Sequence, residues 1–312
     1  MKGTLRYLTG AAGPSGFGSN STAEQVTEGI SSLIPTQLTA IITGATSGIG
    51  AETARVMAKR GVRLVIPARD LKKAAEIKEE IKKEIPKAEI IRLELDLSSF
   101  ASIKRFSSSF LALGLPLNIL INNAGKFCPN LEFSDDKFEM TFATNYLGHF
   151  LLTELLAEKM VETAARTGIE GRIINVSSVI HGWVKREKFQ FNDLLNPKNY
   201  NGTRAYAQSK LANIFHAKEL ARRFIVRLKS SKRSSDSQCY PSRHCEDWNH
   251  QRPEESDHRF SVFPGIEATK IHFSVSIGRV DNLFCCPKPS DQRSEREVLG
   301  RLQSDLMFKP CE

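Results

Sequence analysis

The sequence of 312 residues contains no long apolar run. A helix that crosses a bilayer needs about 20 consecutive, mainly apolar residues. The most apolar stretch here, Phe110 to Ile121, is interrupted by Gly114, Pro116 and Asn118. We therefore expect no transmembrane span.

Cysteine is scarce in the front part of the chain, where Cys128 alone of the six cysteines precedes residue 230. No disulfide framework can hold such a domain, which is typical of a reducing compartment. Cys239, His244, Cys245 and His250 lie close together in the sequence, but they do not have the spacing of a known zinc site, so we expect no metal.

The net charge of +9 and the pI of about 9.3 are compatible with three kinds of partner: nucleic acid, an anionic membrane surface or a phosphorylated cofactor. A nucleic-acid binder usually shows a basic stripe interleaved with aromatic residues. The sequence has none, so we expect no nucleic-acid partner.

The chain divides into three parts by composition. Residues 1–36 are rich in Gly, Ser and Thr and are either a targeting peptide or a mature N-terminal arm. Ser21 and Glu24 have the spacing of a capping box, which favours the arm. In residues 37–226 short apolar strands alternate with amphipathic helices, and residues 227–312 show no sustained period of 2 or 3.6. The alternation predicts a Rossmann-type α/β fold, a doubly wound parallel sheet with helices on both faces.

A glycine-rich turn joins the first apolar strand to the first helix. In "TGATSGIG", Gly44 permits a tight turn, Gly48 lets the backbone approach a pyrophosphate, and Gly50 allows close packing. The helix that follows directs its N-terminus at the phosphates. The second strand ends with Arg69, a cation suited to a 2′-phosphate, so we favour NADP(H) over NAD; the alternative is a solvated loop charge.

Tyr206 and Lys210 are four residues apart on a predicted helix and therefore share a face. A nearby ammonium stabilises a phenolate and lowers the pKa of the tyrosine. Ser178 ends the fifth strand, at the carboxyl edge where ligands bind, and could hydrogen-bond a substrate carbonyl. Asn145 could hold a water in a proton relay, and Asp96 could accept a hydrogen bond from an adenine.

In this order, the motifs resemble those of the short-chain dehydrogenase/reductase family over about residues 38–223. The resemblance implies hydride transfer between NADP(H) and a carbonyl or alcohol. It makes Tyr206 the acid–base, Lys210 the ligand of the nicotinamide ribose, Ser178 the group that polarises the carbonyl and Asn145 part of the relay. The cofactor would contact Tyr206, Lys210, Gly44, Ala45, Thr46, Ser47, Gly48, Ile49, Gly50, Arg69, Asp96, Leu97 and Asn123.

Three segments narrow the resemblance: "SGFGSNSTAEQVTEGI", "TFATNYLGHFLLT" and "RAYAQSKLANI". They are similar to plant members of the family that associate with the protein-import translocon of the chloroplast inner envelope, and more distantly to retinol dehydrogenases. This implies a chloroplast location at the inner envelope, with the cytosol as the alternative, and translocon components as partners. It also implies an alternative function, a non-catalytic, redox-responsive subunit of the import assembly.

The tail departs from the family. A strand and a His-Pro-Gly turn are expected about thirty residues after Tyr206, but "QCYPSRHCEDWNH" stands there instead. Codons for Cys239 to Arg252 exist that, read one base later, give AIHPGIVKTGIIR, the missing segment. We therefore hypothesise that residues 227–312 are translated out of frame, with the C-terminal strands replaced by an irregular, largely disordered tail. The fifth strand would then lose its neighbour, and turnover of this chain would be weak or absent.

Overall fold

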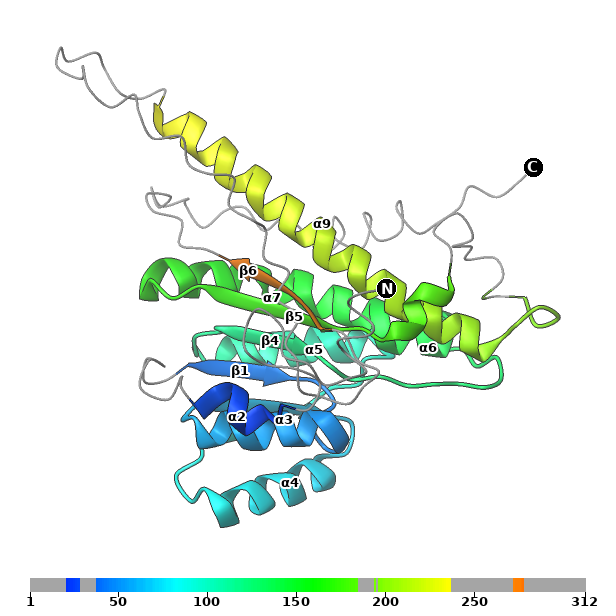
Figure 1. Cartoon of the computed structure of the whole chain (residues 1–312), viewed down its shortest axis with the longest axis horizontal. Helices are drawn as coiled ribbons and strands as arrows, with labels where there is room; N and C mark the ends of the chain where they lie inside the picture. The colour runs from blue at the N-terminus through cyan, green and yellow to red at the C-terminus, as the bar shows by residue number, and fades with distance from the viewer. Residues whose placement is uncertain (1–20, 29–37, 185–193, 195, 237–271, 278–312) are drawn as a thin grey trace. The chain divides into compact units, whose positions relative to one another are not determined.

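The computed structural model describes residues 21–28, 38–184, 194, 196–236 and 272–277 (Figure 1). The chain divides into two compact units, Met1–Val280 and Asp281–Glu312, and every described residue belongs to the first. The predicted disorder of the tail concerns residues that, except for 227–236 and 272–277, lie outside the described ones.

A single sheet with the strand order β3-β2-β1-β4-β5-β6 forms the centre of the first unit. Neighbouring strands from β3 to β5 are parallel. The bounds are β1 Thr39–Ile42, β2 Arg63–Ala68, β3 Ile90–Glu94, β4 Ile119–Asn122, β5 Gly171–Val176 and β6 His272–Ile277. All four residues of β1 are buried, as expected for a central parallel strand covered on both faces.

Helices connect the strands and cover the sheet. Because the strand order reverses between β1 and β4, right-handed crossovers place α3 and α4 on one face and α5 and α7 on the other. The predicted doubly wound fold is thereby confirmed. The bounds are α3 Gly48–Lys59, α4 Leu71–Glu84, α5 Phe100–Ala112, α6 Met140–Phe142, the π-helical turn η1 Ala143–Leu147, α7 Gly148–Thr167, the 3-10 helix η2 Val179–Trp183 and α9 Gly202–Asp236.

The outer edge of β5 is paired, contrary to the prediction that it has no neighbour. β6 runs antiparallel to it, with Gly171 opposite Ile277 and Val176 opposite His272. The segment "HFSVSI" alternates over six residues and is rich in residues that favour strands, a short pattern that the absence of period in the tail conceals. Unpaired backbone groups at a strand edge accept such a partner. α9 also extends past the boundary expected at residue 226.

The arm contributes a short helix, α2 (Ala23–Glu28). Its capping box is formed by Thr22 and Gln25, not by Ser21 and Glu24: Thr22 N donates to Gln25 Oε1 at 2.8 Å, and Gln25 N donates to Thr22 Oγ1 at 3.2 Å. Both pairs have the required spacing, and the second leaves Glu24 available for α3.

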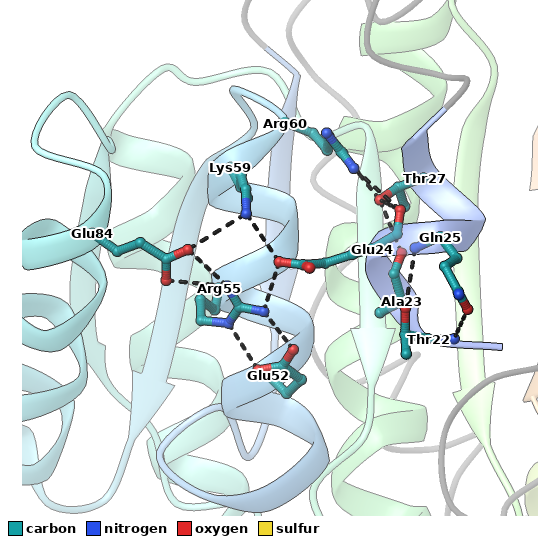
Figure 2. Close-up of polar contacts among 10 residues, drawn as sticks. All are labelled: Thr22, Ala23, Glu24, Gln25, Thr27, Glu52, Arg55, Lys59, Arg60 and Glu84. Carbon is teal, nitrogen blue, oxygen red and sulfur yellow. Dashed lines mark hydrogen bonds and ion pairs between the residues drawn. The ribbon is translucent and has the colours of Figure 1, made fainter. Parts of the chain in front are cut away.

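Ion pairs join α2 to α3 (Figure 2). The Glu24 carboxylate lies 3.0 Å from Arg55 Nη2 and 3.0 Å from Lys59 Nζ. Arg55 also contacts Glu52 and Glu84, so three carboxylates share two cations. These contacts hold the pKa of Glu24 below its usual value, chiefly through the hydrogen bond from Lys59.

Among the described residues, no helix combines the length and the apolar composition that a membrane crossing requires.

Candidate active site

The glycine-rich turn leaves β1 at its carboxyl end and enters α3. Gly44 has a φ of +66°, and a Cβ there would lie 2.8 Å from the Cα of Ala124. A Cβ on Gly50 would overlap the Gly44 carbonyl oxygen. Both positions therefore need glycine because the backbone packs on itself.

Gly48 differs from the other two glycines of the turn. Its φ is +54°, and a Cβ there would have no atom within 4 Å, so the space above it is open. Ser47 precedes α3 in an extended conformation without capping it through its side chain. The N-terminus of this helix thus has no side-chain cap and begins beside open space at Gly48, which suits a phosphate group. The turn fits the pyrophosphate of a dinucleotide.

Thr43 ties this turn to the end of β4. Its Oγ1 accepts hydrogen bonds from the backbone N–H groups of Asn123 at 2.9 Å and Ala124 at 3.0 Å. The Asn123 side chain donates to the Thr43 carbonyl at 2.9 Å and the Gly44 carbonyl at 3.4 Å. Asn123, a predicted cofactor ligand, therefore holds the turn together.

Other predicted cofactor ligands lie just after β2 and β3. Arg69 is exposed just after β2. Asp70, the next residue, caps α4 and accepts from Lys72 N at 2.8 Å. Asp96 follows β3, and its Oδ1 accepts from both the backbone and the hydroxyl of Ser98, at 2.8 and 2.6 Å.

Asn145 lies in the π-helical turn η1 and is fully buried. Its Oδ1 accepts from Lys126 N at 2.7 Å, while Nδ2 donates to the Lys126 carbonyl at 3.0 Å and to Ser209 Oγ at 3.1 Å. The side chain therefore fixes the loop after β4 against α9. A Cβ on Gly125 would lie 3.6 Å from Asn145 Oδ1 and 3.7 Å from Lys210 Nζ, so the missing side chain leaves both groups facing one space.

Ser178 and Ser177 end β5 with different environments. Ser178 is the N-cap of η2 and is 6% exposed. Ser177 is fully buried and donates to the Lys210 carbonyl at 2.8 Å, as expected for the residue that points to the other face. The Ser177 bond fixes the stretch of α9 around Lys210 on the end of β5.

Tyr206 and Lys210 lie one turn apart on α9, with Lys210 Nζ 5.5 Å from the centre of the Tyr206 ring. Lys210 is buried and donates to the Val176 carbonyl at 3.3 Å. Burial raises the pKa of the Tyr206 phenol, so the lowering predicted from the sequence is wrong for this arrangement. Desolvation of a half-buried phenol outweighs the attraction of an ammonium that lies over the ring.

Three residues that help to build this site were not predicted from the sequence. Gly148 opens α7 directly against the Leu97 carbonyl oxygen, which a Cβ would overlap. Ser209 links Asn145 to the Tyr206 carbonyl, to which it donates at 2.7 Å. His149 contacts Thr43 Oγ1 at 2.8 Å. The Gly148–His149 pair after "NYL" is the one sequence signal that could have indicated these contacts. No group of three or more potential metal ligands gathers among the described residues.

A family model described as short chain dehydrogenase matches residues 38–188. The chain is 52% identical to the short-chain dehydrogenase TIC 32 B, chloroplastic, of Brassica napus, over 69% of this chain and 67% of that one. It is 44% identical to retinol dehydrogenase 12 of Mus musculus over 59% of this chain and 55% of that one. The chain thus spans about two thirds of the first relative's length and little more than half of the second's.

A solved structure of an uncharacterised protein from Mycobacterium paratuberculosis superposes with a TM-score of 0.52. It is 34% identical and covers 63% of this chain and 66% of its own. Together with the parallel sheet and the ordered motifs, these similarities show that the chain belongs to the short-chain dehydrogenase/reductase family of oxidoreductases.

Proposed function

We propose that this chain binds NADP(H) and catalyses hydride transfer between the nicotinamide and a small carbonyl or alcohol substrate. The observation that carries the proposal is the convergence of an open glycine-rich cradle with Asn145, Tyr206 and Lys210. All lie at the carboxyl edge of one parallel sheet, near the switch point between β1 and β4. Open α/β sheets bind their ligands at this place.

Residues of three segments would hold the cofactor. The turn from Gly44 to Gly50 and the N-terminus of α3 are suited to the pyrophosphate, and Arg69 to a 2′-phosphate. Asp96 and Leu97 lie after β3, where an adenine would rest. When bound, the nicotinamide supplies or accepts the hydride.

Proton movement would fall to the side chains around α9. Tyr206 transfers a proton to or from the substrate oxygen, which Ser178 orients with a hydrogen bond. Lys210 favours the phenolate electrostatically once its ammonium turns from the Val176 carbonyl towards bound ligand. The space at Gly125, bordered by Lys210 Nζ and Asn145 Oδ1, suits a water that completes the relay.

The surroundings of Tyr206 favour an apolar substrate. The ring of Phe127 lies 6.1 Å from the Tyr206 ring in an edge-to-face arrangement and is half exposed. Val179 and Trp183 are exposed on η2, which follows Ser178 directly. Exposed apolar side chains beside a catalytic group commonly contact the ligand.

The identity with the chloroplastic TIC 32 proteins supports a chloroplast location, with association at the inner envelope and translocon components as partners. It also supports a second candidate function, that of a non-catalytic, redox-responsive subunit of the import assembly. Under the catalytic function, the departure of the tail from the family sequence lowers the turnover that we expect from this chain.

Two variants test the proposal. Tyr206→Phe keeps the ring and removes the hydroxyl, so turnover should fall on the order of 100-fold or more while NADPH binding is retained. If the chain is a scaffold, the variant changes neither partner binding nor function. Arg69→Gln should weaken NADPH binding about 10-fold and leave NADH binding unchanged. Equal effects on both cofactors would contradict the assignment of NADP(H).

A further inference from the structure

His149 lies in the first turn of α7 and bridges two parts of the site. Its side chain is buried, with 1% exposed. The ring Nε2 lies 2.8 Å from Thr43 Oγ1, which belongs to the glycine-rich turn. The ring Nδ1 lies 3.0 Å from the backbone carbonyl oxygen of Asn145. One imidazole thus contacts both the cofactor turn and the relay residue.

The neighbours of Thr43 fix the tautomer of this ring. Thr43 Oγ1 already accepts two backbone hydrogen bonds, from Asn123 and Ala124, which use its lone pairs. Its single hydrogen has two possible acceptors, His149 Nε2 at 2.8 Å and the Ile121 carbonyl at 3.3 Å. The Ile121 carbonyl also accepts from Thr43 N at 3.0 Å. The hydroxyl therefore donates to Nε2, and the proton of the neutral ring lies on Nδ1, which donates to Asn145 O.

The local backbone accounts for the availability of this carbonyl. Asn145 is at the centre of η1, where the Gly148 N–H bonds back five residues to Ala143 O. Such a turn widens the helix and is frequent at functional sites. The side chain of Asn145 is committed to Lys126 and Ser209, so His149 holds the residue from the backbone side.

A protonated imidazole could not make both hydrogen bonds, because its Nε2 could no longer accept one from Thr43. Burial, with a smaller contribution from the Lys210 ammonium, lowers the pKa of His149 to about 4, although the hydrogen bond to the Asn145 carbonyl acts in the opposite direction. The ring is therefore neutral at pH 7, which allows Nε2 to accept a hydrogen bond. A neutral ring also adds no positive charge beside Lys210.

We propose that His149 is a positioning residue, whose Nδ1–H tautomer couples the cofactor turn at Thr43 to the relay residue Asn145. The inference rests on the proposed function. Cofactor bound at the turn would then stabilise the placement of Asn145, and a displacement of either Thr43 or Asn145 would displace the other.

The first test reads the ring itself. Long-range ¹H–¹⁵N NMR of the full chain resolves histidine tautomers, and the His149→Gln variant identifies the signals that belong to His149. The expected result is a neutral ring protonated on Nδ1 from pH 8 down to pH 5. A ring protonated on Nε2, or one that gains a proton near pH 6.5, would overturn the proposal.

The second test separates the two bonds with a pair of variants. In His149→Asn the side-chain amide reaches about the position of Nδ1 and can donate to Asn145 O, but it does not reach Thr43. In His149→Gln the amide reaches about the position of Nε2 and can accept from Thr43, but it loses Asn145. The Asn variant should raise the Kd for NADPH on the order of 10-fold and keep its kcat relative to the unaltered chain. The Gln variant should keep the Kd and lower kcat on the order of 10- to 100-fold.

Hydrogen exchange gives a readout that needs no turnover. The Lys126 N–H donates to Asn145 Oδ1 and should lose protection in the Gln variant alone. Thr167→Val removes a hydroxyl bond to the Thr163 carbonyl at the far end of α7 and controls for general weakening of that helix. Thr167→Val should change neither the Kd for NADPH, nor kcat, nor the exchange of the Lys126 N–H.

The outcomes distinguish this inference from the proposed function. An unaltered chain that binds no NADPH contradicts the proposed function. A chain that binds NADPH, but whose Asn and Gln variants change the Kd, kcat and Lys126 exchange alike, contradicts the role of His149. Loss of both binding and folding in the two variants, with the Nδ1–H tautomer absent from the NMR spectrum, also overturns it.

Discussion

Adding one methyl group to Gly48 should separate cofactor binding from stability. The position has a φ of +54° and open space around the missing Cβ. Alanine there incurs only the strain of a left-handed backbone, about 1–2 kcal/mol. For a domain of this size that corresponds to a fall in Tm of roughly 2–8 °C. The methyl group would also occupy the space in which we place the pyrophosphate.

Gly61 provides the matched control. Its φ is +80°, a Cβ there also has no atom within 4 Å, and it lies in the turn between α3 and β2. Gly61→Ala should cost about the same 1–2 kcal/mol. NADPH binding, followed by the change in nucleotide fluorescence, should weaken about 10-fold or more in Gly48→Ala and stay unchanged in Gly61→Ala. Equal affinities of the two variants for NADPH would refute the assignment of the glycine-rich turn as the pyrophosphate site.

Three further results are expected. Burial lowers the pKa of His149 to about 4 and of His216 to about 3, so the unfolded chain binds more protons below pH 6.5. Stability should therefore fall by about 3 kcal/mol between pH 6.5 and pH 5; urea unfolding checks this, and a flat profile contradicts it. Glu24→Gln should speed proteolysis of the N-terminal arm at low salt, because it removes the ion pairs to Arg55 and Lys59. Glu76→Gln makes the same charge change on α4 and should not speed proteolysis. Equal rates for the two variants would mean that the ion pairs do not hold α2. Sequencing the transcript across the codons for Leu220 to His250 should show one base gained or lost relative to the genomic frame, and an uninterrupted frame would refute the frame-shift hypothesis.

Local patterns were sufficient to predict the sheet and most helices. β1, β2 and β4 are buried runs bounded by turn residues, and the spacing of Tyr206 and Lys210 requires a helix to bring them together. The capping box was predicted one residue too early because two overlapping pairs satisfy the same rule. β6 was missed because its six alternating residues stand in a tail without other periodicity.

Features of the site that depend on distant segments could not be predicted. The bridge from Thr43 through His149 to Asn145 joins β1 to α7, and no spacing in the sequence encodes it. The pKa of Tyr206 is raised by burial of the phenol, which depends on the segments packed around it. Sequence motifs identify the groups, whereas burial and partner geometry decide their ionisation.

Direct observation of hydride transfer tests the central claim most directly. The chain would be incubated with NADPH carrying deuterium at the transferable position and with a small apolar aldehyde, and the alcohol would be analysed by mass spectrometry. Even at low turnover, the account predicts deuterium in the alcohol with the unaltered chain and its loss in Tyr206→Phe. Alcohol without deuterium, or as much deuterated alcohol from Tyr206→Phe as from the unaltered chain, would contradict the account.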